Sequence, residues 1–319
     1  MKSLVDSFTK EEFDKNRHFI DKFYRYFENA ISKEYYEENI IEMGYLLTDI
    51  YERNGEYKKS VKIAKSILHI YKSIPSVSDT VFRKKYVRQM IGCTYSVAIA
   101  KLPHKDELMN DAECLFEMVT PIFNDFVNDV TNPDEDRYFI AGLYHSNYGA
   151  FLLNKGMYND AQKEYEKSLS ERLNCLLSID ESDTDKREEV ENMIGRSKLN
   201  IGYACYYLGD YKKSVEKQKE ALIIFEEQND KSRIHQTKDC ILGGYIELWK
   251  SNIDKFNAED FIMCCLYITD LLNYYSANED IKAKIKLKKD EVESIIDLLP
   301  VIKDKEQARE IFKNILGGI

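Results

Sequence analysis

The side chains that could carry out chemistry are spread thinly along this chain. Its five histidines stand far apart, with neither the HExxH pattern nor any paired spacing of a metal site. The glycine patterns of dinucleotide, phosphate and acyl-transfer sites (GxGxxG, GxxxxGK[ST] and GxSxG) are absent. We therefore expect no enzyme activity, no bound metal and no cofactor.

Carboxylates do gather in two places, residues 134–136 and residues 180–185. The second cluster comes nearest to a calcium loop, but it lacks the ligand spacing and the glycine that such a loop needs. Carboxylates also favour the positive end of a helix, so we expect both clusters to cap or precede helices.

The cysteines and the N-terminal residues indicate the cellular compartment. The seven cysteines are odd in number, form no CxxC and lie mostly inside apolar helical runs, which favours buried, reduced thiols. The opening residues, MKSLVDSFTKEEFDKN, contain no apolar segment of a secretory signal. No apolar stretch approaches the roughly 20 residues of a membrane-spanning helix. We expect a cytoplasmic protein without a membrane partner.

The amino-acid composition limits which fold classes and which partners fit the chain. The chain has 319 residues, of which 44% are hydrophobic and 32% charged, so it can bury a core. Only 13 glycines and 5 prolines interrupt it, which favours long helices over a turn-rich β fold. A net charge of −10 repels the phosphate backbone of nucleic acids, so we expect no direct binding to nucleic acid.

Apolar residues recur every three or four positions along almost the whole chain, a spacing typical of amphipathic helices. Asp79, Asp134 and Asp210 are candidate N-caps. Residues 281–287 alternate as a strand would, but the longer window favours a helix there. The predicted helices cover residues 9–31, 33–53, 57–73, 79–101, 106–130, 136–154, 158–179, 186–207, 211–228, 232–252, 258–276, 279–299 and 304–316.

An internal repeat is the strongest feature of the sequence. Three segments, starting at Ile41, Gly142 and Gly195, align on a common frame of about thirty-four positions. The central parts of the three segments have the sequences NGEYKKSVKIAKSIL, KGMYNDAQKEYEKSL and LGDYKKSVEKQKEAL. Each holds a glycine in a tight turn and a small residue one turn into the second helix. The glycines are Gly55, Gly156 and Gly209, and the small residues are Ser60, Ala161 and Ser214.

These hairpins resemble the tetratricopeptide repeat (TPR) family, which also requires the small residues found at position 8 of the frame: Thr48, Gly149 and Gly202. The copies depart from the family at position 4, where Gly44, His145 and Lys198 replace a bulky aromatic residue. The resemblance implies an all-α, right-handed superhelical solenoid of about five or six antiparallel helix hairpins. We expect residues 1–40 to form a helical cap or a docking segment, residues 41–276 the array, and residues 277–319 capping helices.

In a solenoid of this kind the first helix of each hairpin lines the concave side. Six residues would reach that groove: Asn147, Asn154, Arg196, Asn200, Tyr203 and Tyr207. A side-chain amide carries two donors and an acceptor, so it can pair with the backbone of an extended peptide. In related peptide-binding members of the family, an asparagine at the position of Asn147 and Asn200 plays that role. Arg196 could pair with a carboxylate, and the tyrosines could pack against apolar side chains.

These assignments leave alternatives open. The asparagines could instead bond neighbouring helices, and the tyrosines could fill the core. The first hypothesis for function is a non-enzymatic scaffold that binds a protein or a peptide in the groove. The alternatives are a bacterial peptide-sensing regulator of the TPR type, and a regulatory or structural subunit of a larger complex, which could contain an enzyme.

Overall fold

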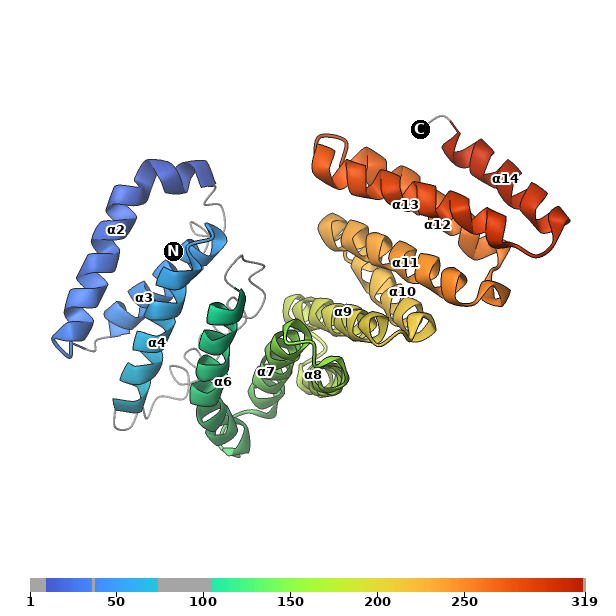
Figure 1. The fold of residues 1–319 in the computed structure, drawn as a ribbon. Coiled ribbons are helices and arrows are strands. Elements are labelled where there is room, and N and C mark those ends of the chain that lie inside the picture. The colour runs from blue at the N-terminus through green and yellow to red at the C-terminus, as the bar shows by residue number, and fades with distance from the viewer. Residues whose placement is uncertain (1–9, 36–37, 74–104, 318–319) are drawn as a thin grey trace. The chain divides into compact units, whose positions relative to one another are not determined.

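The computed structural model describes residues 10–35, 38–73 and 105–317, and within these ranges it contains helices but no strand (Figure 1). The fold is all-α and is built from TPR-like hairpins, as predicted. The helix predicted at 79–101, with Asp79 and Cys93, lies outside the described residues. The chain divides into two compact units, Met1–Ser178 and Ile179–Ile319.

The first unit contains two helix pairs joined by tight turns. In these pairs α3 packs against α4, and α7 against α8, while α2 packs on α3 and α6 on α7. Most helix bounds agree closely with the prediction, because the apolar spacing and the turn glycines fix them. The helices are α2 (Lys10–Ser32), α3 (Glu38–Arg53), α4 (Tyr57–Ser73), α6 (Lys105–Asn128), α7 (Asp134–Asn154) and α8 (Tyr158–Ser178).

In the second unit each helix packs on the next along the chain, and α11 also contacts α9 and α13. Residues 281–287 lie inside α13, so the helical interpretation of this segment is confirmed. The elements are α9 (Thr184–Tyr207), α10 (Tyr211–Glu227), α11 (Lys231–Ser251), the short 3₁₀ helix η1 (Ile253–Lys255), α12 (Ala258–Tyr274), α13 (Glu279–Leu298) and α14 (Ile302–Leu316).

The turns inside the hairpins are those the repeat predicts. Gly55, Gly156 and Gly209 have φ values of 77°, 80° and 79°, a conformation that penalises any residue with a Cβ atom. The predicted cap Asp210 is confirmed, because its side chain accepts a hydrogen bond from Lys213 N at 3.2 Å. The same prediction for Asp134 is wrong. Pro133 occupies the N-cap position of α7 without a side-chain cap bond, and Asp134 is the first helical residue.

Small residues let the two helices of a hairpin approach closely. A Cβ atom at Gly149 would lie 2.8 Å from the ring of Tyr165, closer than carbon atoms pack. The hydroxyl of Ser214 donates to the carbonyl oxygen of Gly202 at 2.8 Å, across the α9–α10 pair. The small residues at positions 8 and 20 are buried in all three copies: Thr48, Gly149, Gly202, Ser60, Ala161 and Ser214.

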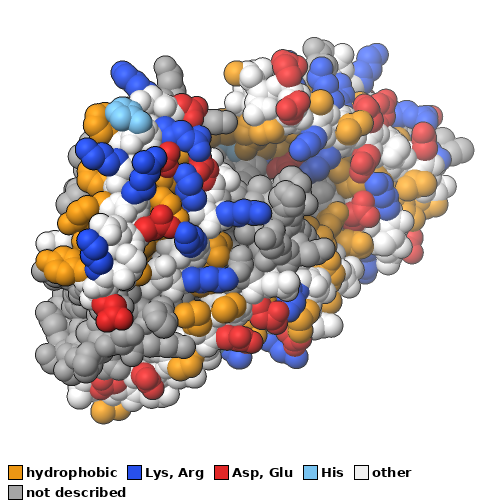
Figure 2. All heavy atoms as spheres, turned by 60° about the vertical axis from the view of Figure 1, so that its left-hand side comes forward, with side chains coloured by type: hydrophobic (Ala, Val, Ile, Leu, Met, Phe, Trp, Pro, Cys, Tyr) orange, Lys and Arg blue, Asp and Glu red, His pale blue; other side chains and the backbone are white. Residues whose placement is uncertain are grey.

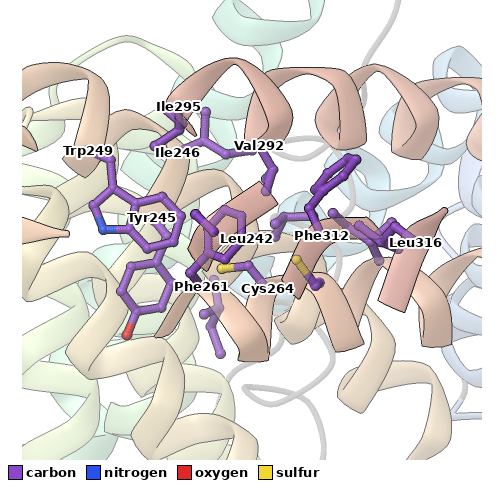
Figure 3. Packing of buried hydrophobic residues seen from close by; sticks show 14 of the residues in the cluster. Leu242, Tyr245, Ile246, Trp249, Phe261, Cys264, Val292, Ile295, Phe312 and Leu316 are labelled. Carbon is purple, nitrogen blue, oxygen red and sulfur yellow. The ribbon is translucent and has the colours of Figure 1, made fainter. Parts of the chain in front are cut away.

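A hydrophobic cluster of the second unit draws on five successive helices. Side chains from α10, α11, α12, α13 and α14 meet in it, and Figure 3 shows part of it; Trp249, Phe261 and Cys264 have no exposed surface there. Each large apolar side chain buried in this way contributes about 1.5–3 kcal/mol. Because no pair of helices could bury this cluster alone, stacking stabilises the unit and fixes the surface that faces outward.

Candidate functional site

Four of the six predicted groove residues lie on one helix, α9 (Figure 1). Arg196, Asn200, Tyr203 and Tyr207 follow each other at intervals of four, three and four residues, so they share one helical face. Arg196 and Tyr207 are exposed, whereas Asn200 and Tyr203 are half-buried. We call this row, with the adjoining residues Gln236 and Cys240 of α11, the α9–α11 surface.

Asn200 occupies the middle of this surface. Its side-chain amide makes no hydrogen bond to any other residue that the structure describes. A half-buried amide has lost part of its hydration and gains most from a partner that offers both a donor and an acceptor. The backbone of an extended peptide offers that combination.

Tyr203 is held in place from the next hairpin. Its hydroxyl accepts hydrogen bonds from Gln236 Nε2 at 3.2 Å and from Cys240 Sγ at 3.0 Å. Burial raises the pKa of Tyr203 well above its ordinary value, and burial raises the pKa of the Cys240 thiol to about 11. Both groups therefore stay protonated near neutral pH, and the tyrosine ring forms a fixed wall beside Asn200.

Arg196 is oriented by a chain of polar side chains. Its Nε donates to Asn192 Oδ1 at 3.0 Å, and Asn192 Nδ2 donates to Gln228 Oε1 at 2.8 Å. Gln228 Nε2 in turn donates to the carbonyl oxygen of Glu188 at 2.9 Å. This relay joins the start of α9 to the end of α10 and positions the guanidinium at the surface, where it can meet a ligand carboxylate.

Tyr207 ends the surface toward the α9–α10 turn. Its side chain is 54% exposed, and its ring lies edge-on to Tyr206 with centroids 5.8 Å apart. Tyr206 also packs against Tyr211, with ring centroids 5.5 Å apart. An exposed aromatic ring on a supported base is the kind of anchor that dominates binding surfaces.

The remaining two predicted residues, Asn147 and Asn154, lie on α7 in the first unit. Asn147 is only 4% exposed. Asn154 Nδ2 donates to the carbonyl oxygen of Ala150 at 3.0 Å, one turn back on its own helix. Their part in a ligand groove stays a prediction.

Sequence reasoning missed Gln236 and Cys240, which position Tyr203. They stand four residues apart on α11, so they share a face, but α11 belongs to a hairpin too divergent to align on the repeat frame. Helical spacing alone marks that face. The contact with Tyr203 depends on how α11 packs on α9.

In the described part of the chain, no three His, Cys, Asp or Glu side chains come together as a metal site. The acidic residues of 180–185 form turn and cap bonds, as predicted: Asp180 accepts from Ser182 N at 2.8 Å and Asp183 from Lys186 N at 3.3 Å. None of the described helices has the length and apolar character needed to cross a bilayer.

Comparisons with known proteins add little to this geometry. No protein-family model matches the chain, and no curated protein matches it. Among solved structures, one titled "Crystal Structure of the Apo Form of RapI" is similar, with a TM-score of 0.45 and 14% sequence identity. The match covers 86% of this chain and 97% of that one.

Proposed function

We propose that the chain is a non-enzymatic helical-repeat protein that binds an extended peptide or protein segment on the α9–α11 surface. The proposal rests mainly on the state of Asn200. Its side-chain amide is half-buried and has no hydrogen-bond partner among the described residues, and it lies between Arg196 and Tyr203, whose side chains are held in place. Its amide would pair with one backbone N–H and one C=O of the ligand.

The neighbours of Asn200 would make the other contacts with the ligand. Arg196 would pair with a ligand carboxylate, while the Tyr207 ring would cover an apolar side chain. Tyr203 would act as a rigid wall, because its hydroxyl is already bonded to Gln236 and Cys240. An arrangement with one backbone contact and two side-chain contacts fits an affinity in the micromolar range, about −8 kcal/mol.

The proposed location is the cytoplasm. Cys114, Cys175, Cys205, Cys240, Cys264 and Cys265 are all free thiols in the described residues. Free cysteines in this number fit a reducing compartment.

A selection from a display library of random peptides on the full-length chain tests the proposal. We expect related peptides to be enriched on the wild-type protein, and Asn200→Ala to weaken their binding about tenfold or more. The substitution should leave the unfolding midpoint nearly unchanged, because it removes no hydrogen bond to a described residue.

The matched control is Asn273→Ala, which removes an exposed amide from α12, outside the α9–α11 surface. It should leave peptide binding intact. Failure to enrich any peptide, or equal binding by the wild type and Asn200→Ala, would contradict the proposal.

A further inference from the structure

A second surface, outside the α9–α11 surface, stands out on α2. Three large aromatic side chains point away from the protein there: Phe19, Phe23 and Tyr26 are 53%, 57% and 57% exposed. Their spacing of four and three residues places them in one row along the helix. Single exposed apolar residues are ordinary, but a row of three on one helix face is a contiguous patch.

Another face of α2 already secures the helix. Phe13, Ile20 and Phe27 are buried there, with 2%, 6% and 1% of their surface exposed. Phe27 packs so tightly on Gly44 of α3 that a Cβ atom at Gly44 would lie 2.6 Å from its ring. The outward aromatic row is therefore not needed to hold α2 in place.

The part of α2 that carries the aromatic row is rich in basic residues, whereas Glu11, Glu12 and Asp14 lie before it. Between Lys15 and Tyr26 the one acidic residue is Asp21, and it pairs with Lys59 of α4 at 2.8 Å. The exposed cations Lys15, Lys22 and Arg25 form no ion pair with any described residue. On the side of the first unit that Figure 2 brings forward, Lys and Arg side chains lie next to hydrophobic ones, with Asp and Glu side chains also present. In a chain of net charge −10, this face is locally positive.

We propose that the outer face of α2 docks an acidic amphipathic helix of a partner protein. The row Phe19, Phe23 and Tyr26 follows the i, i+4, i+7 pattern by which one helix packs its apolar stripe on another surface. Lys15, Lys22 and Arg25 then pair with carboxylates that flank the partner's apolar stripe, which gives the contact its specificity.

Other occupants fit the charges less well. A second copy of the chain, docked through its own α2, would place lysine against lysine along the row. An anionic bilayer or a nucleic acid would meet a narrow patch on a protein whose net charge of −10 repels it. An acidic helix needs only the local positive charge and the aromatic row.

The test uses the full-length protein and two fluorescently labelled synthetic helices of about 18 residues. Both carry leucines along one face, flanked by glutamates in one peptide and by lysines in the other. We expect the wild type to bind the glutamate helix about tenfold more tightly than the lysine helix at low salt, and we expect added salt to reduce the difference. Net charge alone would give the opposite preference.

Two variants locate the binding. Lys22→Glu/Arg25→Glu should reverse the preference between the two helices, whereas Phe19→Ala/Phe23→Ala should weaken both. The matched control, Lys284→Glu/Lys286→Glu, makes the same charge change at exposed positions of α13 and should keep the wild-type preference. The measurement on the wild type needs no variant, so the test holds even if a variant folds poorly.

Several outcomes would overturn the proposal. These are an equal or stronger affinity of the wild type for the lysine helix, no binding of the glutamate helix at about 1 mM, and an unchanged preference in Lys22→Glu/Arg25→Glu. Sedimentation with phosphatidylserine-containing vesicles in the absence of peptide binding would assign the face to a membrane. Dimerisation that Phe19→Ala/Phe23→Ala abolishes would assign it to a second copy.

Discussion

Gly202 on α9 lies directly against Gln218 on α10. A Cβ atom at Gly202 would come within 2.7 Å of Gln218 Cγ and within 3.1 Å of the carbonyl oxygen of Ser214. Gln218 is itself 1% exposed and cannot swing into solvent. The close approach of the two helices in this hairpin therefore depends on the missing side chain.

Gly202→Ala should destabilise the protein by about 1–3 kcal/mol, because the added methyl group forces α9 and α10 apart. Gly243→Ala is the matched control in a neighbouring helix. There the nearest atom to an added Cβ is Lys288 Nζ at 3.8 Å, so alanine should stabilise the helix by about 0.5–1 kcal/mol. Chemical denaturation measures both, and equal effects of the two substitutions would show that packing at Gly202 is not tight.

The N-cap of α10 gives a second test. Asp210→Ala removes the hydrogen bond to Lys213 N and should cost about 1 kcal/mol in the free energy of unfolding. Asp134→Ala should change it by less than about 0.5 kcal/mol, because Asp134 makes a surface ion pair with Arg137 and no cap bond. A larger loss at Asp134 than at Asp210 would contradict the cap assignment.

Glu164 on α8 makes stability depend on pH. Burial raises the pKa of this carboxyl, but hydrogen bonds from His145 and Lys167 outweigh burial and lower its pKa below the ordinary 4.5. A carboxyl whose pKa is lower in the folded state stabilises the fold above its unfolded pKa, and the contribution is lost as the pH falls through the folded pKa.

Glu164→Gln should therefore lower the free energy of unfolding by about 1–2 kcal/mol near pH 7, and the loss should shrink as the pH falls below 4.5. Urea denaturation at a series of pH values measures this. Glu117→Gln, at an exposed position of α6, is the control and should show little effect at any pH. A loss at Glu164 that stays constant down to acid pH would rule out the ionised carboxylate as its source.

Substitutions at Tyr203 and Tyr207 should affect stability and peptide binding differently. Tyr203→Phe keeps the ring but removes the hydroxyl that accepts hydrogen bonds from Gln236 and Cys240. It should lower the free energy of unfolding by about 1 kcal/mol and change peptide affinity little. Tyr207→Ala removes an exposed ring and should weaken peptide binding while the unfolding midpoint stays near that of the wild type. Calorimetric titration with a selected peptide, together with melting curves, measures both. The opposite pattern would make Tyr207 a structural residue.

The helices and turns could be predicted from sequence because local chemistry fixes them. Gly209 and Asp210 mark the α9–α10 turn through a positive φ and a cap bond that only a few residue types supply. Asp134 shows the limit of this reasoning: the adjacent Pro133 takes the N-cap position, which shifts the aspartate into the helix.

The candidate site could be predicted in part. Periodicity places Arg196, Asn200, Tyr203 and Tyr207 on one face of α9, but it cannot say which of them is already bonded. The hydroxyl of Tyr203 is bonded by Gln236 and Cys240, whereas the amide of Asn200 has no such partner in the described residues. That difference comes from the packing of α9 on α11 and is not encoded in the spacing of either helix.

The most direct test of the central claim asks whether Asn200 binds the backbone of the ligand. Each backbone amide of a selected peptide is N-methylated in turn, and binding of each version to the wild type and to Asn200→Ala is measured by calorimetry. We expect one position at which N-methylation weakens binding to the wild type but not to Asn200→Ala, with a coupling of about 1 kcal/mol or more. Additive effects at every position, in a peptide that binds both proteins, would contradict it.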